Sequence, residues 1–182
     1  MSDFKPDFKS GFQPALRPVL GKKGAIASTA IKLSPLPEGA IIHVLAAPGA
    51  ADMEVRLRSL AKGDVRAVSP GQWFIVGEEP LSHAEMKAFL AVLEPQATGV
   101  DQSQGRVRIR IEGRMAERVL AKGTAADLSI AAFPTGHSAT TLIGHIAAHL
   151  TRLDGQVFEV IVLRGFAESL WDDLARMSLE FQ

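Results

Sequence analysis

The chain has 182 residues, of which 47% are apolar and 22% charged, the balance of a globular protein that can bury a core. Its 20 basic and 20 acidic residues cancel, so we expect no general attraction to nucleic acid or anionic membranes. The absence of cysteine excludes disulfides, thiolate metal sites and cysteine nucleophiles. No apolar run is long enough for a transmembrane helix, and the amino terminus lacks a signal-peptide core. We therefore expect a cytoplasmic protein.

The first segment, residues 1–24, differs in composition from the rest of the chain. It contains three prolines, three glycines and five basic residues without a sustained period. Such a segment is typical of a flexible arm that only a partner would order. We expect residues 25–182 to form a single domain of two intertwined lobes, about 25–96 and 97–182.

The first regular elements lie between residues 41 and 76. The apolar, β-branched run 41–45 predicts a strand, and helical spacing of apolar residues follows over 53–60. Residues 65–68 and 73–76 then predict two strands, separated by the turn Ser69-Pro70-Gly71.

The clearest helical signal covers residues 82–93. Ser82 and Glu85 have the spacing of a capping box, in which each side chain satisfies a backbone donor of the first turn. Leu81 and Met86 are placed for a hydrophobic staple across the same turn.

Residues 106–112 alternate between apolar and basic side chains, which predicts a strand with one buried face. The basic face consists of Arg106, Arg108 and Arg110. A short helix is expected next, ending at Gly123, a residue suited to a left-handed helix terminus.

The run 140–153 has both helical and strand periodicity. We interpret it as a strand because Asp154-Gly155 suits a type I′ hairpin turn and 157–163 is strongly strand-like. A closing helix is predicted from the apolar residues Phe166, Leu170, Leu174 and Met177. The order strand, strand, helix thus recurs about four times, which predicts an α+β fold.

Two histidines, His145 and His149, have a spacing that could bind zinc on a helix. On a strand they would lie about 13 Å apart, too far to share one metal ion. We therefore predict no metal site, and interpret them as sheet-face histidines that are packed or contact a subunit.

The three arginines of the alternating strand could bind an anion, RNA or an acidic partner. Zero net charge and the absence of tyrosine disfavour nucleic acid. Trp171 lies beside the apolar stripe of the closing helix, a position that suits a subunit contact. The candidate interface residues are therefore Arg106, Arg108, Arg110, His145, His149 and Trp171.

No catalytic or cofactor-binding residue is predicted. Ser138 follows His137 directly, but no nucleophile elbow is present, so these residues are interpreted as turn-forming. The segment Gly21-Lys22-Lys23-Gly24 lacks the order of a phosphate-binding loop.

Several short motifs together resemble the gamma subunit of heterotetrameric sarcosine oxidase over about residues 31–177. They are Pro70-Gly71-Gln72-Trp73, Asp101-Gln102-Ser103, Val119-Leu120-Ala121-Lys122-Gly123, Asp127-Leu128, Phe133-Pro134, Gly144-His145-Ile146, and Arg164-Gly165-Phe166-Ala167 before Leu170-Trp171. The resemblance implies ferredoxin-like halves related to the folate-binding domain of aminomethyltransferases.

It also implies a function. The whole oxidase demethylates sarcosine to glycine, produces hydrogen peroxide and passes the one-carbon unit to tetrahydrofolate. By resemblance, this chain would be a non-catalytic assembly subunit with alpha, beta and delta partners. No cofactor is then expected on this chain, whereas FAD, FMN, NAD and tetrahydrofolate are expected on the partners.

The hairpin 154–159 bears on the alternative of a stand-alone folate-binding protein of the aminomethyltransferase group. Folate-binding relatives place a glutamate there that holds the pterin, and Gly155 occupies that position in this chain. Glycine has no carboxylate to accept the hydrogen bonds of a pterin edge. An alignment shifted by one residue would place Asp154 there instead. A lone interaction domain serving another partner is the third possibility.

Overall fold

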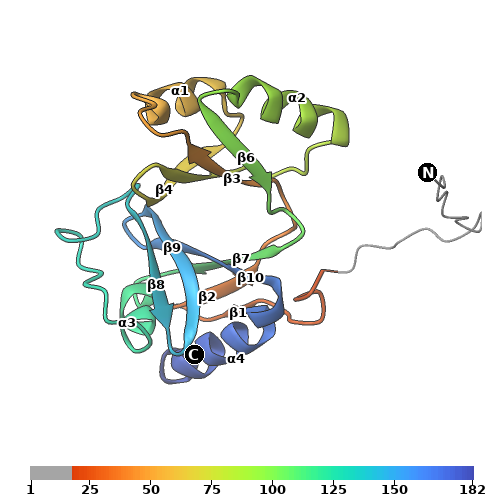
Figure 1. Ribbon diagram of the computed structural model, residues 1–182. Helices are drawn as coiled ribbons and strands as arrows, with labels where there is room; N and C mark the ends of the chain where they lie inside the picture. Colours follow the sequence, from red (N-terminus) through yellow and green to blue (C-terminus); the bar gives the residue numbers. More distant parts are fainter. Residues whose placement is uncertain (1–17) are drawn as a thin grey trace, which may run out of the picture.

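Two antiparallel β-sheets stack face to face in the computed structural model, which describes residues 18–182 (Figure 1). Two helices cover the outer face of each sheet, so the layers run helix, sheet, sheet, helix. This arrangement confirms the predicted α+β class.

The smaller sheet has the strand order β4-β5-β3-β6. Its elements in chain order are β3 Ile41–Ala46, α1 Met53–Leu60, β4 Asp64–Ser69, β5 Gln72–Val76, α2 His83–Leu93 and β6 Ala97–Asp101. Its core lies between sheet and helices and includes Val44, Leu57 and Leu93.

The larger sheet has the strand order β1-β2-β7-β10-β9-β8. Its elements are β1 Ile26–Ala27, β2 Lys32–Pro35, β7 Arg106–Glu112, α3 Ala116–Ala121, β8 Ser138–Ile143, β9 Ile146–Asp154, β10 Val157–Leu163, the 3₁₀ turn η1 Arg164–Phe166, α4 Ala167–Ser178 and the 3₁₀ turn η2 Leu179–Phe181.

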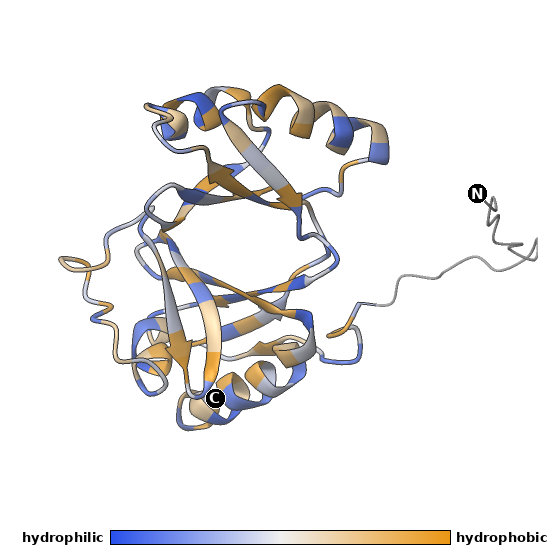
Figure 2. Ribbon diagram, viewed as in Figure 1, coloured by the Kyte–Doolittle hydropathy of each residue, from blue (hydrophilic) through white to orange (hydrophobic). Residues whose placement is uncertain are grey.

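The helices α2 and α4 pack against the sheets, but the buried face of α4 differs from the prediction, since Phe166 is 52% exposed and Trp171 is buried. The capping box of α2 is formed, with Glu85 N donating to Ser82 Oγ at 3.3 Å and Ser82 N donating to Glu85 Oε2 at 2.9 Å. In α4 the buried stripe includes Leu170, Trp171 and Leu174. Figure 2 shows the resulting division of the helices into apolar and polar sides.

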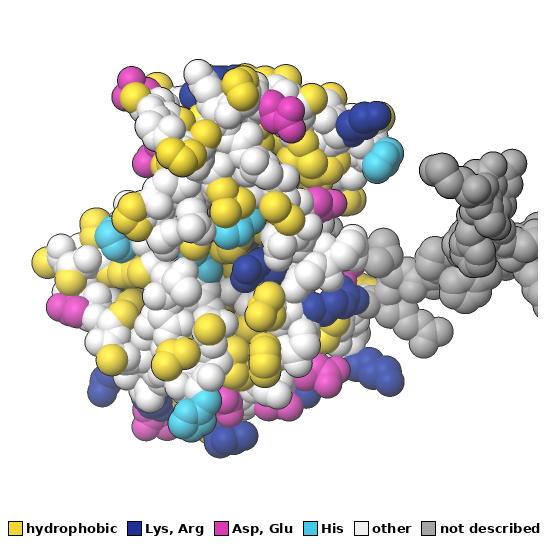
Figure 3. Space-filling view, in the orientation of Figure 1, with side chains coloured by type: hydrophobic (Ala, Val, Ile, Leu, Met, Phe, Trp, Pro, Cys, Tyr) yellow, Lys and Arg dark blue, Asp and Glu magenta, His cyan; other side chains and the backbone are white. Residues whose placement is uncertain are grey.

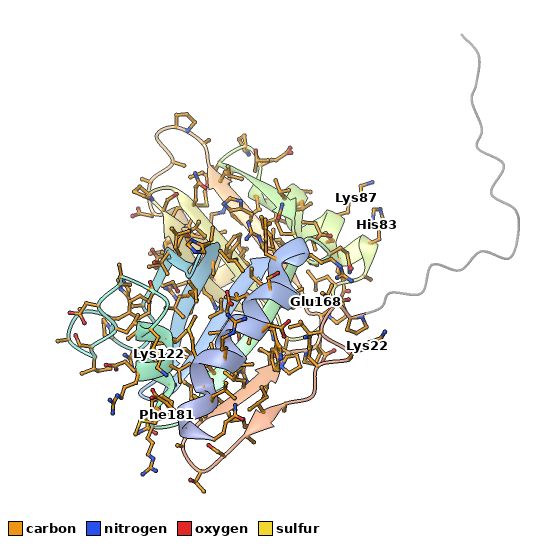
Figure 4. All side chains as sticks on the ribbon, turned by 90° about the horizontal axis from the view of Figure 1, so that it is seen from below. Lys22, His83, Lys87, Lys122, Glu168 and Phe181 are labelled. Atoms are coloured by element: carbon orange, nitrogen blue, oxygen red, sulfur yellow. The ribbon has the colours of Figure 1, made fainter. Side chains whose placement is uncertain are left out.

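The end of the chain is tied to the larger sheet. Ser28 Oγ donates to the backbone oxygen of Phe181 at 2.6 Å. The ammonium group of Lys122 lies 4.7 Å from the centroid of the Phe181 ring, and both residues are labelled in Figure 4. These contacts hold the turn after α4 against the helical layer.

The run 140–153 is two strands, not the single strand that we predicted. Strands β8 and β9 pair with each other through a turn at Gly144-His145, where Gly144 has φ 60°. Apolar residues flank that turn closely, so the periodicity alone did not reveal it. The next hairpin, between β9 and β10, is present as predicted, but neither Asp154 nor Gly155 has a positive φ, so its turn is not type I′.

The division of the sheets differs from the predicted lobes. Strands β1 and β2 pair with β7 in the larger sheet, whereas β6 belongs to the smaller one. The boundary at residues 96/97 therefore does not coincide with the sheets, because β6 returns to pair with β3 before the chain crosses.

The predicted arm, residues 1–24, falls mostly outside the described part, since residues 1–17 are not described. Its last residues are anchored: Leu20 is buried in the core, and Lys23 pairs with Asp172 at 2.6 Å. None of the helices in the described part is long and apolar enough to cross a membrane.

Candidate functional site

The basic face of β7 lies between the two sheets. Because side chains of a strand alternate, Val107, Ile109 and Ile111 pack in the core under α3 and α4 while the arginines face the smaller sheet. Only 2% of the Arg108 side chain is exposed. The prediction that this strand has only one buried face is therefore wrong, since the second sheet covers the basic face.

One carboxylate is at the centre of this layer. Glu159 of β10 is 0% exposed and pairs with three arginines from both sheets. Its Oε1 is 2.8 Å from Arg66 Nη1 and 3.6 Å from Arg108 Nε, and its Oε2 is 3.1 Å from Arg110 Nη2. Glu159 thus links the larger sheet to β4 of the smaller sheet.

Two further carboxylates complete the network from the edge. Glu78 Oε2 is 2.8 Å from Arg108 Nη2, and its Oε1 is 3.6 Å from Arg110 Nη2. Asp64 Oδ2 is 3.2 Å from Arg66 Nη2. The guanidinium groups of these three arginines are therefore compensated within the chain.

An aromatic cluster adjoins the ion pairs. The centroid of the Phe74 ring lies 5.0 Å from the centroid of the His43 ring and 5.1 Å from that of the His149 ring. The guanidinium carbon of Arg106 lies 4.6 Å from the same Phe74 centroid. His149 Nε2 donates to the backbone oxygen of Ala67 at 2.9 Å. Its buried Nδ1 then has no hydrogen-bond partner among the described residues.

The surroundings of the cluster favour neutral imidazoles. Burial lowers the pKa of His149 to about 4, and the charges of Arg66 and Arg106 act in the same direction. Burial also lowers the pKa of His43, with a smaller contribution from Arg106. The same desolvation lowers the pKa of Arg106. Desolvation by burial is the cause common to all three residues.

The structure does not bring the predicted histidine pair together. His145 is exposed in the β8–β9 turn, whereas His149 is buried in β9. Among residues 18–182, no group of three His, Cys, Asp or Glu side chains could hold a metal ion.

The candidate interface residues occupy different environments. Trp171 is buried in the core rather than at the edge of the apolar stripe, because it lies on the face of α4 that packs against the larger sheet. Arg108 and His149 are also buried between the sheets. Those three side chains therefore cannot reach a partner in this conformation. Arg106, Arg110 and His145 retain exposed surface, and their role at a subunit contact stays a prediction.

The hairpin 154–159 is held by an arginine that the sequence analysis missed. The Arg152 guanidinium is buried and donates to the backbone oxygens of Gly155, at 2.5 Å, and Leu128. Asp154 Oδ1 accepts from Gly155 N at 2.7 Å, so its carboxylate caps its own turn. The sequence held one signal of this role, because Arg152 is the only arginine in the mostly apolar strand β9.

A cavity of about 740 Å³ opens between α1 and α2 at one end of the smaller sheet. It is mostly apolar, and Leu60, Phe89 and Val92 line it. Two of its carboxylates are engaged within the chain, since Glu85 caps α2 and Glu78 pairs with Arg108.

Comparison with solved structures places this fold. The chain superposes on a chain of heterotetrameric sarcosine oxidase from Corynebacterium sp. U-96, with a TM-score of 0.78 and 20% identity, over 91% of this chain and 96% of that one. The fold is that of a sarcosine oxidase chain. It is also similar to aminomethyltransferase T of the glycine cleavage system from Bartonella henselae, with a TM-score of 0.56 and 16% identity. That match covers 78% of this chain and 44% of the other.

The resemblance read from the sequence is thus confirmed at the level of the fold. No protein-family model matches the sequence. No curated protein matches it either.

Proposed function

We propose that this chain is a non-catalytic structural subunit of a multi-subunit amine oxidase of the sarcosine oxidase type. The observation that carries the proposal is the match over nearly the whole of both chains to one chain of a heterotetrameric sarcosine oxidase. Because the matched chain is similar in length as well as in fold, the similarity is that of a whole subunit rather than of a shared domain.

The chemistry between the sheets supports a structural role. Glu159 and three arginines bind each other instead of facing a substrate-sized cavity. His149, the most buried imidazole, donates its Nε2 proton to the backbone and has a pKa of about 4, so near pH 7 it does not serve as a general acid.

The partners and cofactors belong to the same proposal. Alpha, beta and delta subunits would assemble with this chain in the cytoplasm. FAD, FMN, NAD and tetrahydrofolate would bind those subunits. The complex would demethylate sarcosine or a related N-methyl amine and form hydrogen peroxide.

Purification of the tagged full chain from its native cell tests the proposal. We expect flavin-bearing subunits to co-purify in fixed stoichiometry and the complex to form hydrogen peroxide from sarcosine. The isolated chain should be colourless and inactive. Absence of flavoprotein partners, or oxidation of sarcosine by the chain alone, would overturn the proposal.

The folate-binding alternative rests on the aminomethyltransferase-like fold. Calorimetric titration of the isolated chain with tetrahydrofolate decides it. We expect no micromolar binding, because Asp154 caps its own turn and Gly155 has no side chain to accept a hydrogen bond.

A further inference from the structure

Arg106 differs from the other three arginines between the sheets. Arg66, Arg108 and Arg110 each pair with a carboxylate, whereas Arg106 makes no ion pair within residues 18–182. Four guanidinium groups therefore face three carboxylates, those of Glu159, Glu78 and Asp64, and one positive charge is left uncompensated. The neighbouring histidines do not change this count when they are neutral.

The position of Arg106 is half-buried and poor in polar partners. Its guanidinium lies over the Phe74 ring, and its buried Nε has no hydrogen-bond partner in the described part of the chain. A cation held against an aromatic face keeps part of its stabilisation but loses hydration. The uncompensated and partly dehydrated guanidinium of Arg106 is therefore expected to bind an anion that can reach it.

The surface beside Arg106 is accessible and apolar. Leu163, the residue opposite Arg106 on β10, is 42% exposed, and so is Val100, the residue opposite His43 on β6. Figure 3 shows the narrowed waist between the two halves, where basic and histidine side chains meet apolar ones. An approaching group would thus meet an apolar border around one cation.

We propose that Arg106 receives a single carboxylate at this waist, supplied by an acidic side chain of a partner subunit. One uncompensated charge matches one carboxylate, and the planar guanidinium can bind it through two parallel hydrogen bonds. The apolar border of Val100 and Leu163 excludes water around the pair. The partner as the source rests on the proposed function; the carboxylate site itself does not.

The first test measures assembly of the full complex. Arg106→Gln is compared with Arg114→Gln, which removes the same charge from an exposed position. Loss of a desolvated charge pair weakens an interface strongly, so we expect Arg106→Gln to raise the Kd for the partner subunits at least about tenfold. The Arg114→Gln complex should match the wild type.

A stability measurement separates this role from a structural one. Because Arg106 compensates no described carboxylate, the isolated Arg106→Gln chain should unfold at or above the wild-type temperature. If that variant instead unfolds earlier and binds partners only as weakly as its stability explains, Arg106 is a structural residue and the proposal is wrong.

The second test asks whether a free carboxylate binds the isolated chain. NMR follows the rings of His43 and His149 as sodium acetate replaces sodium chloride at equal ionic strength. Arg66, Arg106 and Glu159 act on His149, and Gln72 and Arg106 on His43. A carboxylate at Arg106 should raise the pKa of His43 in the wild type but not in Arg106→Gln.

The outcomes are distinct. Weakened assembly of Arg106→Gln alone supports a partner carboxylate. Normal assembly with an acetate response shows a site for a free small carboxylate and overturns the partner as its source. Normal assembly without an acetate response overturns the proposal. If the wild-type chain has no partners at all, the proposed function fails, and the acetate titration still decides the carboxylate site.

Discussion

Glu159 is the residue on which the contact between the sheets depends most. Its strand, β10, is otherwise apolar over Val157–Leu163, and a buried carboxylate there requires compensation from its neighbours. Arg66 supplies it from the other sheet, and Arg110 from the adjacent strand. The contact between the sheets therefore depends on the Glu159 carboxylate, and that carboxylate is stable when buried because the fold brings the arginines to it.

Replacement of Glu159 by Gln should destabilise the chain by about 3–5 kcal/mol, because it removes the buried counter-charge of three arginines and leaves them only the edge carboxylates Asp64 and Glu78. Urea unfolding followed by circular dichroism measures the change. Glu79→Gln is the matched control, since Glu79 is exposed and its removal should alter stability by less than about 0.5 kcal/mol. Equal effects of the two substitutions would contradict the central role of Glu159.

The buried imidazole of His149 makes stability depend on pH. Its pKa in the folded chain is about 4, below the ordinary value of 6.5, so the unfolded chain takes up a proton first as pH falls. Stability from this group is complete above pH 6.5 and is lost between about 6.5 and 4, by up to about 3 kcal/mol.

The free energy of unfolding measured across that range tests this expectation. In His149→Gln the part of the pH dependence due to this residue should disappear, while the exposed His145→Gln should keep the wild-type profile. An unchanged profile in His149→Gln would show that other groups cause the dependence.

At the scale of elements, the β8–β9 hairpin depends on one backbone conformation. Gly144 has φ 60°, which disfavours any residue with a Cβ. An added Cβ would meet no atom closer than 3.6 Å, so the cost is conformational rather than steric. This turn places β8 at one edge of the larger sheet, where it pairs with β9.

Gly144→Ala should therefore lower the melting temperature, with a loss of about 1–2 kcal/mol. Gly155→Ala is the control from the next hairpin, because Gly155 has no positive φ and a Cβ there would meet nothing within 4 Å. A Gly144→Ala chain as stable as Gly155→Ala would contradict the strained turn.

At the scale of the molecule, the two sheets should unfold together. The chain passes between them twice, from β2 to β3 and from β6 to β7, and ion pairs of Glu159 and Glu78 bridge them. The larger sheet is not built from one continuous segment, because β1 and β2 precede the smaller sheet in the chain and β7 to β10 follow it.

Each half contains one tryptophan, which makes this testable. Trp171→Phe leaves Trp73 to report on the smaller sheet, and Trp73→Phe leaves Trp171 to report on the larger one. In each variant the fluorescence and circular dichroism midpoints in urea should coincide. Separate midpoints would show that the halves unfold independently.

The sequence by itself determined the elements whose signals lie within a few consecutive residues. The capping box at Ser82 and Glu85 formed as predicted, because it needs only residues of one helical turn. The alternation of β7 correctly divided its apolar from its basic face. The strands β1, β2 and β6 were missed, because they are short and stabilised by pairing with β7 or β3.

Only the tertiary structure decided which faces are covered. A period of two separates two faces of a strand but does not say whether water or a second sheet lies against the polar one. Here a second sheet supplies Arg66 and Phe74, and Glu159 supplies the counter-charge. The basic stripe of β7 is for this reason part of an internal ionic layer, in which Arg106 alone makes no ion pair with the described residues.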